Sequence, residues 1–473
     1  MWAGHVTINI LPDDVLLCIF YFVRPEYDRL WDLSWWHPVV HVCRRWRTVV
    51  FASPNFLELR LICHPWTRVE LTAIWPPIPI IVWNLKNTDW ALPEDYDFDA
   101  AMVHPNRVCE IHLHLTISQL ERLASVMRRQ FPALIQLSLE TSPGSPPAPA
   151  LPDGFLGGFA PRLQSLELNR IPFPALPNLL LSATDLVSLD LINIPDSGYI
   201  TPEVIVSHLA TLANLEILNI QFESPLSHPN RAGWRPPLPT RTVLAALTRF
   251  HFFGVSDYLE DLVARIDAPL LDSIYIAFCH LLISDISQLA RFIRRTTRIS
   301  VLKDAHMDFN HFGLEVQSLP QTWSAVEISG LTIYCEDHGW DFSSLGQVLT
   351  SLFPSIFMVE HLYIYGSASM LSQDDVDDLP FLEVFHALTT VKNLYVHIKD
   401  AEFFAPILQE YFGGTEAVVL PTLETLCLKK DLQEDQPSEP LQEALGQFVA
   451  ARQLTGHPVA ISYRNWVKEV SSR

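Results

Sequence analysis

The chain has 473 residues, 49% of them hydrophobic, and a formal net charge of −21. This acidic excess argues against proteins that bind nucleic-acid backbones or anionic membranes, because both surfaces would repel the chain. Seven scattered cysteines without a CxxC pair predict reduced thiols in the cytoplasm or nucleus, not a zinc site or a disulfide framework. The N-terminus lacks a basic region and no long apolar run occurs, so neither a signal peptide nor a membrane span is expected.

Two short amphipathic helices are predicted near the N-terminus. The first begins at Pro12, which suits a first helical turn, and continues into Asp13 and Asp14, where the helix dipole favours negative charge. The second begins near Pro38. A unit this small rarely makes a stable core alone, so its apolar stripes need cover from the rest of the chain or from another protein. The predicted stripes are Val15, Leu16, Ile19, Phe20 and Val23 in the first helix, and Val39, Val42, Cys43, Trp46, Val49 and Val50 in the second.

The order of residues in this segment, 8–54, resembles an F-box: Leu-Pro, an acidic pair, an apolar helix, then Val-Cys-Arg-Arg-Trp-Arg. F-box proteins dock onto the Skp-family adaptor, and through it onto the cullin scaffold, of SCF-type cullin-RING ubiquitin ligases. The connection at 24–38 is longer than is usual for the family. The alternative is an ordinary helical hairpin at the start of a globular domain. The resemblance implies an adaptor contact made by Leu11, Pro12, Val15, Leu16, Ile19, Phe20, Val42, Cys43 and Trp46.

Residues 55–106 carry two strand-like runs, at 57–62 and 78–85. We expect this segment to connect the F-box rigidly to the region that follows and to pack on it.

Residues 107–430 repeat a short pattern, apolar-x-x-apolar-x-apolar, at intervals of 23 to 36 residues. The period and pattern resemble leucine-rich repeats, in which each unit adds one parallel strand and one helical or irregular return. The position where such repeats place Asn or Cys is taken by Ile171 and Ile194 in two good copies, so we expect an irregular solenoid. Another α/β domain with several parallel strands is the alternative. Copies begin at 108, 134, 163, 186, 215, 247, 271, 359, 391 and 423, with weaker ones at 299 and 323.

Other segments of the chain complete the predicted organisation. Helical returns are expected at 117–131, 284–294, 376–388 and 402–412, and proline-rich loops at 141–154 and 224–240. An acidic linker, 431–440, precedes a C-terminal cap, 441–473, with a helix at 441–451 and a strand at 459–463. The fold predicted is α/β: a small all-helical F-box, then an irregular leucine-rich-repeat-like solenoid with a parallel sheet. Stretches such as YLEDLVARIDAPLLDSIYI are also similar to an expanded group of fungal F-box proteins with repeat-type C-terminal regions.

Alternation along each predicted strand places its polar positions on one exposed, concave face, the usual binding surface of a repeat stack. We predict that this face binds a protein substrate and that its acidic end favours a basic segment. The alternative is a face with no single ligand, or one covered by a loop. The predicted substrate contacts are Glu110, Glu140, Glu167 and Asp190 at the acidic end, and Phe253, Tyr275, His361, Tyr363, Tyr365, Tyr395 and His397 at the aromatic end.

An enzyme is not expected, because the chain has no HExxH motif, phosphate-binding glycine loop or GxSxG elbow. His112 and His114 share a strand face but lack an evident third metal ligand, and the acidic run at 374–378 does not match an EF-hand loop. No catalytic residue, metal or cofactor is therefore predicted. The sequence favours a non-catalytic substrate receptor of a ubiquitin ligase, which contributes proximity. The alternative is a repeat-based scaffold acting outside a ligase.

Overall fold

The computed structural model describes residues 8–24, 35–63, 77–84, 92–94, 96–143, 148–172, 176–224, 241–278, 286–296, 298, 304–308, 313–317, 330–335, 359–365, 388–398, 401, 420–430 and 438–465. The chain divides into two compact units, Met1–Tyr199 and Ile200–Arg473. Within the described residues, none of the helices combines the length and apolar character needed to cross a bilayer.

The described residues of the first unit's N-terminal segment form three α-helices where two were predicted. The second predicted helix breaks at Cys43, whose backbone is extended (φ −156°, ψ 169°) and whose Sγ accepts a hydrogen bond from the Trp46 N–H at 3.4 Å. Because Cys43 thus caps a new helix, the predicted apolar stripe does not run across it, and Val42 is 59% exposed. The elements are η1 (Ile8–Ile10), α1 (Asp13–Val23), α2 (Trp36–Val42) and α3 (Arg44–Ala52).

These three helices form a small core of their own. The ring of Phe20 meets the edge of Trp46 with centroids 4.9 Å apart. Arg45 in α3 forms an ion pair with Asp13 in α1 at 2.6 Å and also donates to the Leu11 carbonyl, so it joins α3 to the start of α1. The buried apolar side chains of this core are Leu16, Phe20, Trp36, Val40, Val49 and Val50.

A parallel sheet follows the helical segment in the first unit, as predicted. Its strands are ordered by sequence, and each pair of neighbours is parallel. The strand run predicted at 57–62 starts only at Leu61, because residues 54–58 form turns. The segment 55–106 nevertheless adds two strands to the sheet. The strands are β1 (Leu61–Cys63), β2 (Ile80–Trp83), β3 (Val108–Leu115), β4 (Gln136–Thr141), β5 (Ser165–Asn169) and β6 (Ser188–Ile194).

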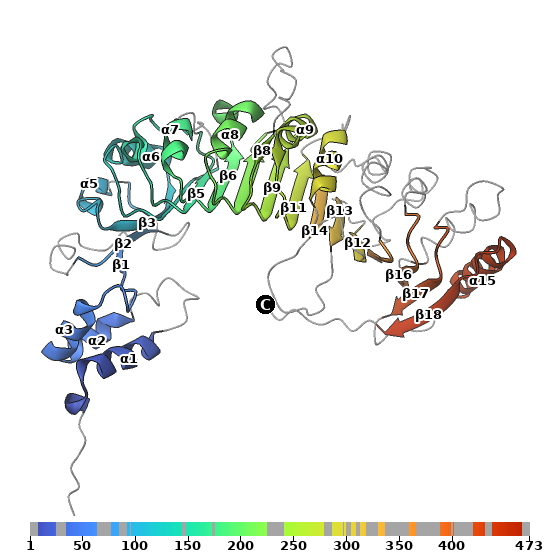
Figure 1. The fold of residues 1–473 in the computed structure, drawn as a ribbon, viewed down its shortest axis with the longest axis horizontal. Coiled ribbons are helices and arrows are strands. Elements are labelled where there is room, and N and C mark those ends of the chain that lie inside the picture. The colour runs from blue at the N-terminus through green and yellow to red at the C-terminus, as the bar shows by residue number, and fades with distance from the viewer. Residues whose placement is uncertain are drawn as a thin grey trace, which may run out of the picture. The chain divides into compact units, whose positions relative to one another are not determined.

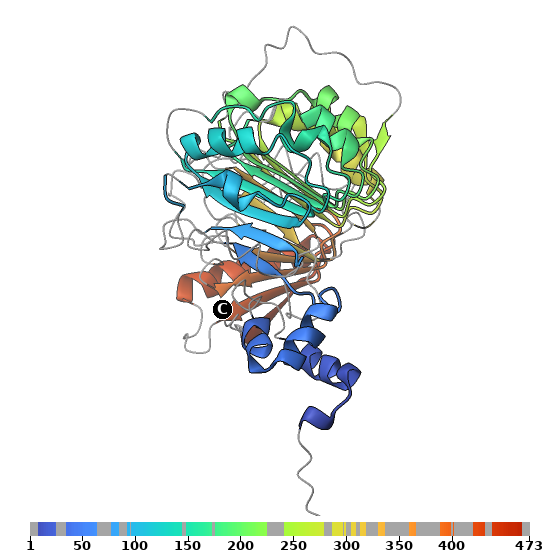
Figure 2. The ribbon, with the colours of Figure 1, turned by 90° about the vertical axis from the view of Figure 1, so that its left-hand side faces the viewer.

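Rows of apolar side chains hold these strands together. The register places Leu139, Leu168 and Leu191 side by side, and all three are buried. Ile171 and Ile194, which occupy the positions where leucine-rich repeats place Asn or Cys, are also buried. Helices α6 and α7 lie on one side of the strands (Figures 1 and 2). The returns are α5 (Phe98–Ala101), α6 (Ile117–Val126), η3 (Phe155–Gly158), α7 (Leu176–Ser182) and η4 (Asp196–Gly198).

The second unit contains a further run of parallel strands with one exception. The order is β7-β9-β11-β14-β13, and β13 is antiparallel to β14, which departs from the purely parallel stack predicted. Helices α8, α9 and α10 lie on one side of β9 and β11 (Figure 1). The elements are α8 (Pro202–Leu209), β7 (Ile217–Phe222), β8 (Thr242–Val243), β9 (Arg249–Gly254), α9 (Ser256–Arg265), β10 (Ile266–Asp267), β11 (Ser273–Phe278), α10 (Ser287–Arg295), β13 (Gly313–Gln317) and β14 (Gly330–Cys335).

A separate five-stranded parallel sheet ends the second unit, in the order β12-β15-β16-β17-β18. The C-terminal helix and strand predicted at 441–451 and 459–463 are both present, although the helix starts at Glu439, inside the predicted acidic linker. Of the remaining predicted segments, 376–387, 402–412 and 225–240 lie outside the described residues. The elements are β12 (Asp304–Asp308), β15 (His361–Tyr365), β16 (Asn393–His397), β17 (Thr425–Lys430), α15 (Glu439–Leu454) and β18 (Ala460–Asn465).

The two weaker pattern copies, which begin at 299 and 323, lie largely outside the described residues. The described strands that follow them are β12, which begins at Asp304, and β14, which begins at Gly330. The residues that face the core of β14 are Leu331 and Ile333, in register with Ile274 and Ile276.

Candidate functional site

Two of the residues predicted to contact an adaptor belong to the core of the helical segment. Leu16 is fully buried and Phe20 is 2% exposed, so neither is available to a partner in this conformation. The other predicted contacts are accessible: Pro12, Val15 and Val42 are exposed, and Leu11, Ile19, Cys43 and Trp46 are half-buried.

Helix α1 nevertheless presents a second apolar side to solvent. Val15, Ile19 and Phe22 recur at four- and three-residue steps, which places them on one face. We call these three residues the exposed stripe. Phe22 is 85% exposed and Val15 is exposed, while Ile19 is half-buried. The sequence prediction did not include Phe22. The signal that could have identified it is that α1 is apolar on more than one side, which predicts that both sides of the helix are covered. Other large apolar residues exposed in this segment are Ile8, Ile10, Tyr21, Val23, Val42 and Phe56.

Polar contacts tie the helical segment to the start of the sheet. The Trp36 indole donates to the Arg60 carbonyl at 3.0 Å, just before β1. Arg24, at the end of α1, forms an ion pair with Glu58 at 2.7 Å. These contacts join the helical segment to residues 58–60, just before β1.

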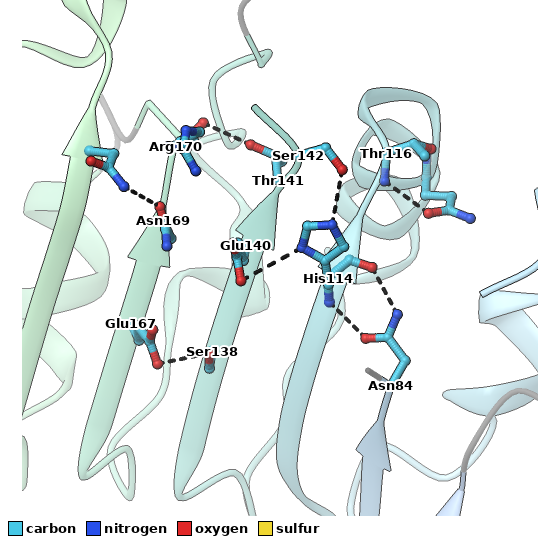
Figure 3. Close-up of polar contacts among 12 residues, drawn as sticks. Asn84, His114, Thr116, Ser138, Glu140, Thr141, Ser142, Glu167, Asn169 and Arg170 are labelled. Carbon is cyan, nitrogen blue, oxygen red and sulfur yellow. Dashed lines mark hydrogen bonds and ion pairs between the residues drawn. The ribbon is translucent and has the colours of Figure 1, made fainter. Parts of the chain in front are cut away.

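The exposed face of the first unit's sheet carries the predicted acidic residues. Alternate residues of β3, β4 and β5 are buried, and the positions between them are half-buried, which confirms the predicted alternation. These carboxylates interact with neighbouring polar side chains. Ser138 donates to Glu167 at 2.8 Å (Figure 3), and Ser188 donates to Asp190 at 2.6 Å. Glu110 lies 3.6 Å from the His112 ring nitrogen.

His114 on this face has polar contacts through both its backbone and its ring (Figure 3). Its backbone forms two hydrogen bonds with the Asn84 side chain, its Nε2 lies 2.9 Å from Ser142 Oγ, and its Nδ1 lies 3.6 Å from Glu140 Oε2. Ser142, His114 and Glu140 follow one another in the order of the hydroxyl, imidazole and carboxylate of a hydrolase triad. The 3.6 Å between His114 Nδ1 and the Glu140 carboxylate is too long for the hydrogen bond that orients a catalytic histidine. In the part of the chain that the structure describes, no three candidate ligands are grouped to hold a metal ion.

The predicted aromatic residues of the second unit lie in both of its larger sheets. In β9 and β11, His251 and Tyr275 are in contact with ring centroids 5.5 Å apart. Tyr275 is exposed and Phe253 is half-buried.

The five-stranded sheet brings three predicted residues together on neighbouring strands. Tyr363 in β15 and Tyr395 in β16 are stacked, with centroids 4.2 Å apart and an interplanar angle of 7°. The Tyr395 hydroxyl lies 3.4 Å from His361 Nδ1. Lys429 of β17 places its Nζ 4.6 Å from the Tyr363 centroid and 5.4 Å from that of Tyr395. Sequence reasoning missed Lys429, although it occupies the same outward position in β17 as His397 does in β16.

No protein-family model and no curated protein matches the chain. Among solved structures, the leucine-rich repeat-containing protein LegL7 from Legionella pneumophila is similar at 13% sequence identity over 85% of this chain and 98% of that one, with a TM-score of 0.28. At that TM-score the likeness supports no conclusion. The chain's own parallel strands and buried apolar rows show an α/β fold with a leucine-rich-repeat-like parallel sheet.

Proposed function

We propose that this protein is a non-catalytic substrate receptor of an SCF-type cullin-RING ubiquitin ligase. Residues 8–54 would bind a Skp-family adaptor and through it a cullin, and the repeat region would bind a target protein in the cytoplasm or nucleus. Neither nucleic acid nor membrane is part of the proposal, because the chain's net charge of −21 opposes both.

The observation that carries the proposal is the exposed stripe of α1. The helical segment already has a core, with Leu16 and Phe20 buried, yet Val15 and Phe22 remain exposed on the other side of the same helix. Clustered exposed apolar side chains on a soluble unit mark a site for a protein partner. The F-box-like order of residues around this stripe favours a Skp-family adaptor as that partner.

The sheets of the repeat region supply the surface for a target. In the first unit, Glu110, Glu140, Glu167 and Asp190 line the outward positions of neighbouring strands. A basic segment of a target would complement them. Hydrogen bonds from Ser138 and Ser188 hold the carboxylates of Glu167 and Asp190 in place, so these two side chains need little ordering on binding.

A binding assay with purified Skp adaptor and the full chain tests the first half of the proposal. We expect a Val15→Asp, Phe22→Ala double variant to bind at least about tenfold more weakly, because an anchor residue is lost and a charge is placed in the contact. Val243→Asp introduces the same charge at another exposed valine, outside the helical segment, and should leave adaptor binding unchanged.

Failure of the parent chain to bind the adaptor would overturn the ligase role. Adaptor binding that does not recruit a cullin in a reconstituted mixture would instead favour a repeat-based scaffold acting outside a ligase. Circular dichroism of each variant separates loss of binding from loss of fold.

A further inference from the structure

The last strand of the five-stranded sheet has one edge that no other described strand pairs with. β18 ends the order β12-β15-β16-β17-β18, and its described pairing is with β17 (Figure 1). The Ala460 N–H donates to the Glu424 carbonyl at 2.9 Å, so Ala460 turns its backbone groups toward β17. Successive residues of a strand turn these groups to opposite edges, so the N–H and C=O groups of Ile461 and Tyr463 point to the open edge.

The same edge exposes side chains that continue the buried rows of the sheet. The register places Ile461 beside Leu426 and Tyr463 beside Leu428, so all four point to the core side. Leu426 is 2% exposed and Leu428 is fully buried, whereas Ile461 is half-buried and Tyr463 is 52% exposed. The end unit of a repeat stack needs a polar outer face when nothing follows it. Here an aliphatic and an aromatic side chain occupy that position.

This end of the sheet also carries little charge. Residues 460–463 are uncharged, and the exposed residues of α15 between Gln442 and Leu454 include a single charged one, Glu443. The whole chain has a net charge of −21, so two copies repel one another over most of their surfaces. Two copies that meet at β18 avoid most of this repulsion, whereas a strongly charged peptide would find no complementary charge there.

We propose that two copies of this chain associate by antiparallel pairing of their β18 strands. With Ser462 opposite Ser462 of the second copy, Ile461 exchanges two backbone hydrogen bonds with Tyr463 of the second copy, and Tyr463 does the same with Ile461 of the second copy. The open-edge groups of both residues then have partners. The pairing also sets each Ile461 side chain beside a tyrosine ring, a stabilising cross-strand pair.

A second copy fits this edge better than an unrelated strand. An extended segment of another protein could add to an open edge through its backbone alone. The second copy also brings the matching apolar side chains and an equally uncharged end, and a two-fold axis makes the contact self-complementary. β18 has six residues, or a length of about 20 Å, so the interface is small and we expect a dissociation constant of about 1–100 μM.

The dimer does not depend on the function proposed above, because β18 is remote in sequence from the helical segment that would bind an adaptor. Each dimer would carry two helical segments and two repeat regions. Two linked receptors bind a target with repeated sites more tightly than one does.

Sedimentation velocity of the full chain, at concentrations from about 1 to 200 μM, tests for the dimer. We expect a reversible monomer–dimer equilibrium. Ile461→Pro should weaken it by at least about tenfold while the fold is kept, because an edge strand tolerates proline where its N–H faces solvent. Tyr463→Glu should have a similar effect, since it places like charges near one another across the two-fold axis, and Tyr463→Phe is its matched control. A parent chain that is monomeric throughout would overturn the proposal.

A cysteine at the centre of the pairing tests the register. Residues opposite one another in a non-hydrogen-bonded antiparallel pair have Cα atoms about 4.5 Å apart, which a disulfide can join. Mild oxidation should therefore give a covalent dimer with Ser462→Cys. It should give much less with the parent chain, which has the exposed Cys18, or with Val243→Cys, at a valine that is 61% exposed. Equal cross-linking in all three chains would contradict the proposed pairing.

Amide exchange distinguishes a second copy from a cover supplied by the same chain. The amides of Ile461 and Tyr463 should exchange quickly in dilute, monomeric protein and more slowly as the dimer forms. Slow exchange that does not change with protein concentration would show that the edge is already covered within one chain. That result would overturn the proposal, and circular dichroism checks that each variant is folded.

Discussion

The side chain of Asn84 forms two hydrogen bonds with the backbone of His114. The His114 N–H donates to Asn84 Oδ1 at 2.7 Å, and Asn84 Nδ2 donates to the His114 carbonyl at 2.8 Å (Figure 3). Asn84 follows the last residue of β2 and is only 6% exposed. Its amide therefore continues the pairing of β2 with β3 by one step, and it holds His114 beside Ser142 and Glu140.

Replacing Asn84 should destabilise this end of the sheet. Asn84→Ala removes the partner of both His114 backbone groups, and we expect the free energy of unfolding to fall by about 2 kcal/mol. Asn84→Asp keeps an acceptor for the His114 N–H but sets a buried carboxylate oxygen against the His114 carbonyl, so it should destabilise as well. Urea unfolding measures the loss, and amide hydrogen exchange locates it. An unchanged exchange rate at His114 in Asn84→Ala would contradict the assignment.

Two phenylalanines in α1 differ in burial, so replacing each of them tests the packing of the helical segment. Phe20 is 2% exposed and packs against Trp46, whereas Phe22 is 85% exposed. Phe20→Ala should reduce the stability of this segment by about 3–5 kcal/mol, because it empties a core site. Phe22→Ala should change it by no more than about 0.5 kcal/mol. Hydrogen exchange of α1–α3 measures both effects, and similar protection in the two variants would show that the burial assignment is wrong.

Helix α10 receives its N-terminal cap from the preceding helix. Its N-cap residue, Ile286, has no capping side chain, and the N–H groups of Gln288 and Leu289 donate to the two carboxylate oxygens of Glu260 in α9, each at 2.8 Å. Glu260→Ala should cost about 1–2 kcal/mol, in the range of a lost helix cap. Glu260→Gln keeps one acceptor and should have a smaller effect.

Amide exchange in the first turn of α10 measures the loss of this cap. We expect the amides of Gln288 and Leu289 to exchange faster in Glu260→Ala. Glu443→Ala removes an exposed acidic residue from α15 and serves as the control. Equal exchange in the two variants would indicate that the inter-helix cap contributes nothing.

Burial of His208 near the end of α8 predicts a pH dependence. Burial lowers the pKa of His208 below its ordinary value of 6.5, so the neutral ring is favoured in the folded state. As the pH falls through 6.5, the unfolded chain binds a proton that the folded chain does not, and stability decreases until the folded-state pKa is passed. His208→Gln removes this contribution. Urea midpoints between about pH 7 and pH 5 should therefore fall less in the variant than in the parent; equal slopes would contradict the prediction.

Much of the repeat region could be predicted because its signal is local. The apolar pattern begins at Leu134, Leu163 and Leu186, and in the structure a strand begins two residues after each of them. Further along, the pattern is weaker, and the residues that face the core of β14 are Leu331 and Ile333. A weak apolar pattern fits several registers, and only pairing with β11 selects one of them.

The helical segment shows a different limit of prediction. Both sides of α1 are apolar, and the sequence could not say that Leu16 and Phe20 would be buried while Val15 and Phe22 stayed exposed. That choice depends on where α3 packs. The break at Cys43, in turn, depends on a cap that forms only between Cys43 and Trp46.

The sequence by itself determined the parallel strands, their approximate spacing and the alternation of buried and exposed residues along each one. These follow from the period of a strand, because successive side chains must point to opposite faces whatever surrounds them. The tertiary structure alone decided which polar residues meet. Asn84 and Ser142 reach His114, and Lys429 reaches Tyr363, across strands that are distant in sequence. Such contacts depend on strand order and register, which are properties of the assembled sheet and not of any one segment.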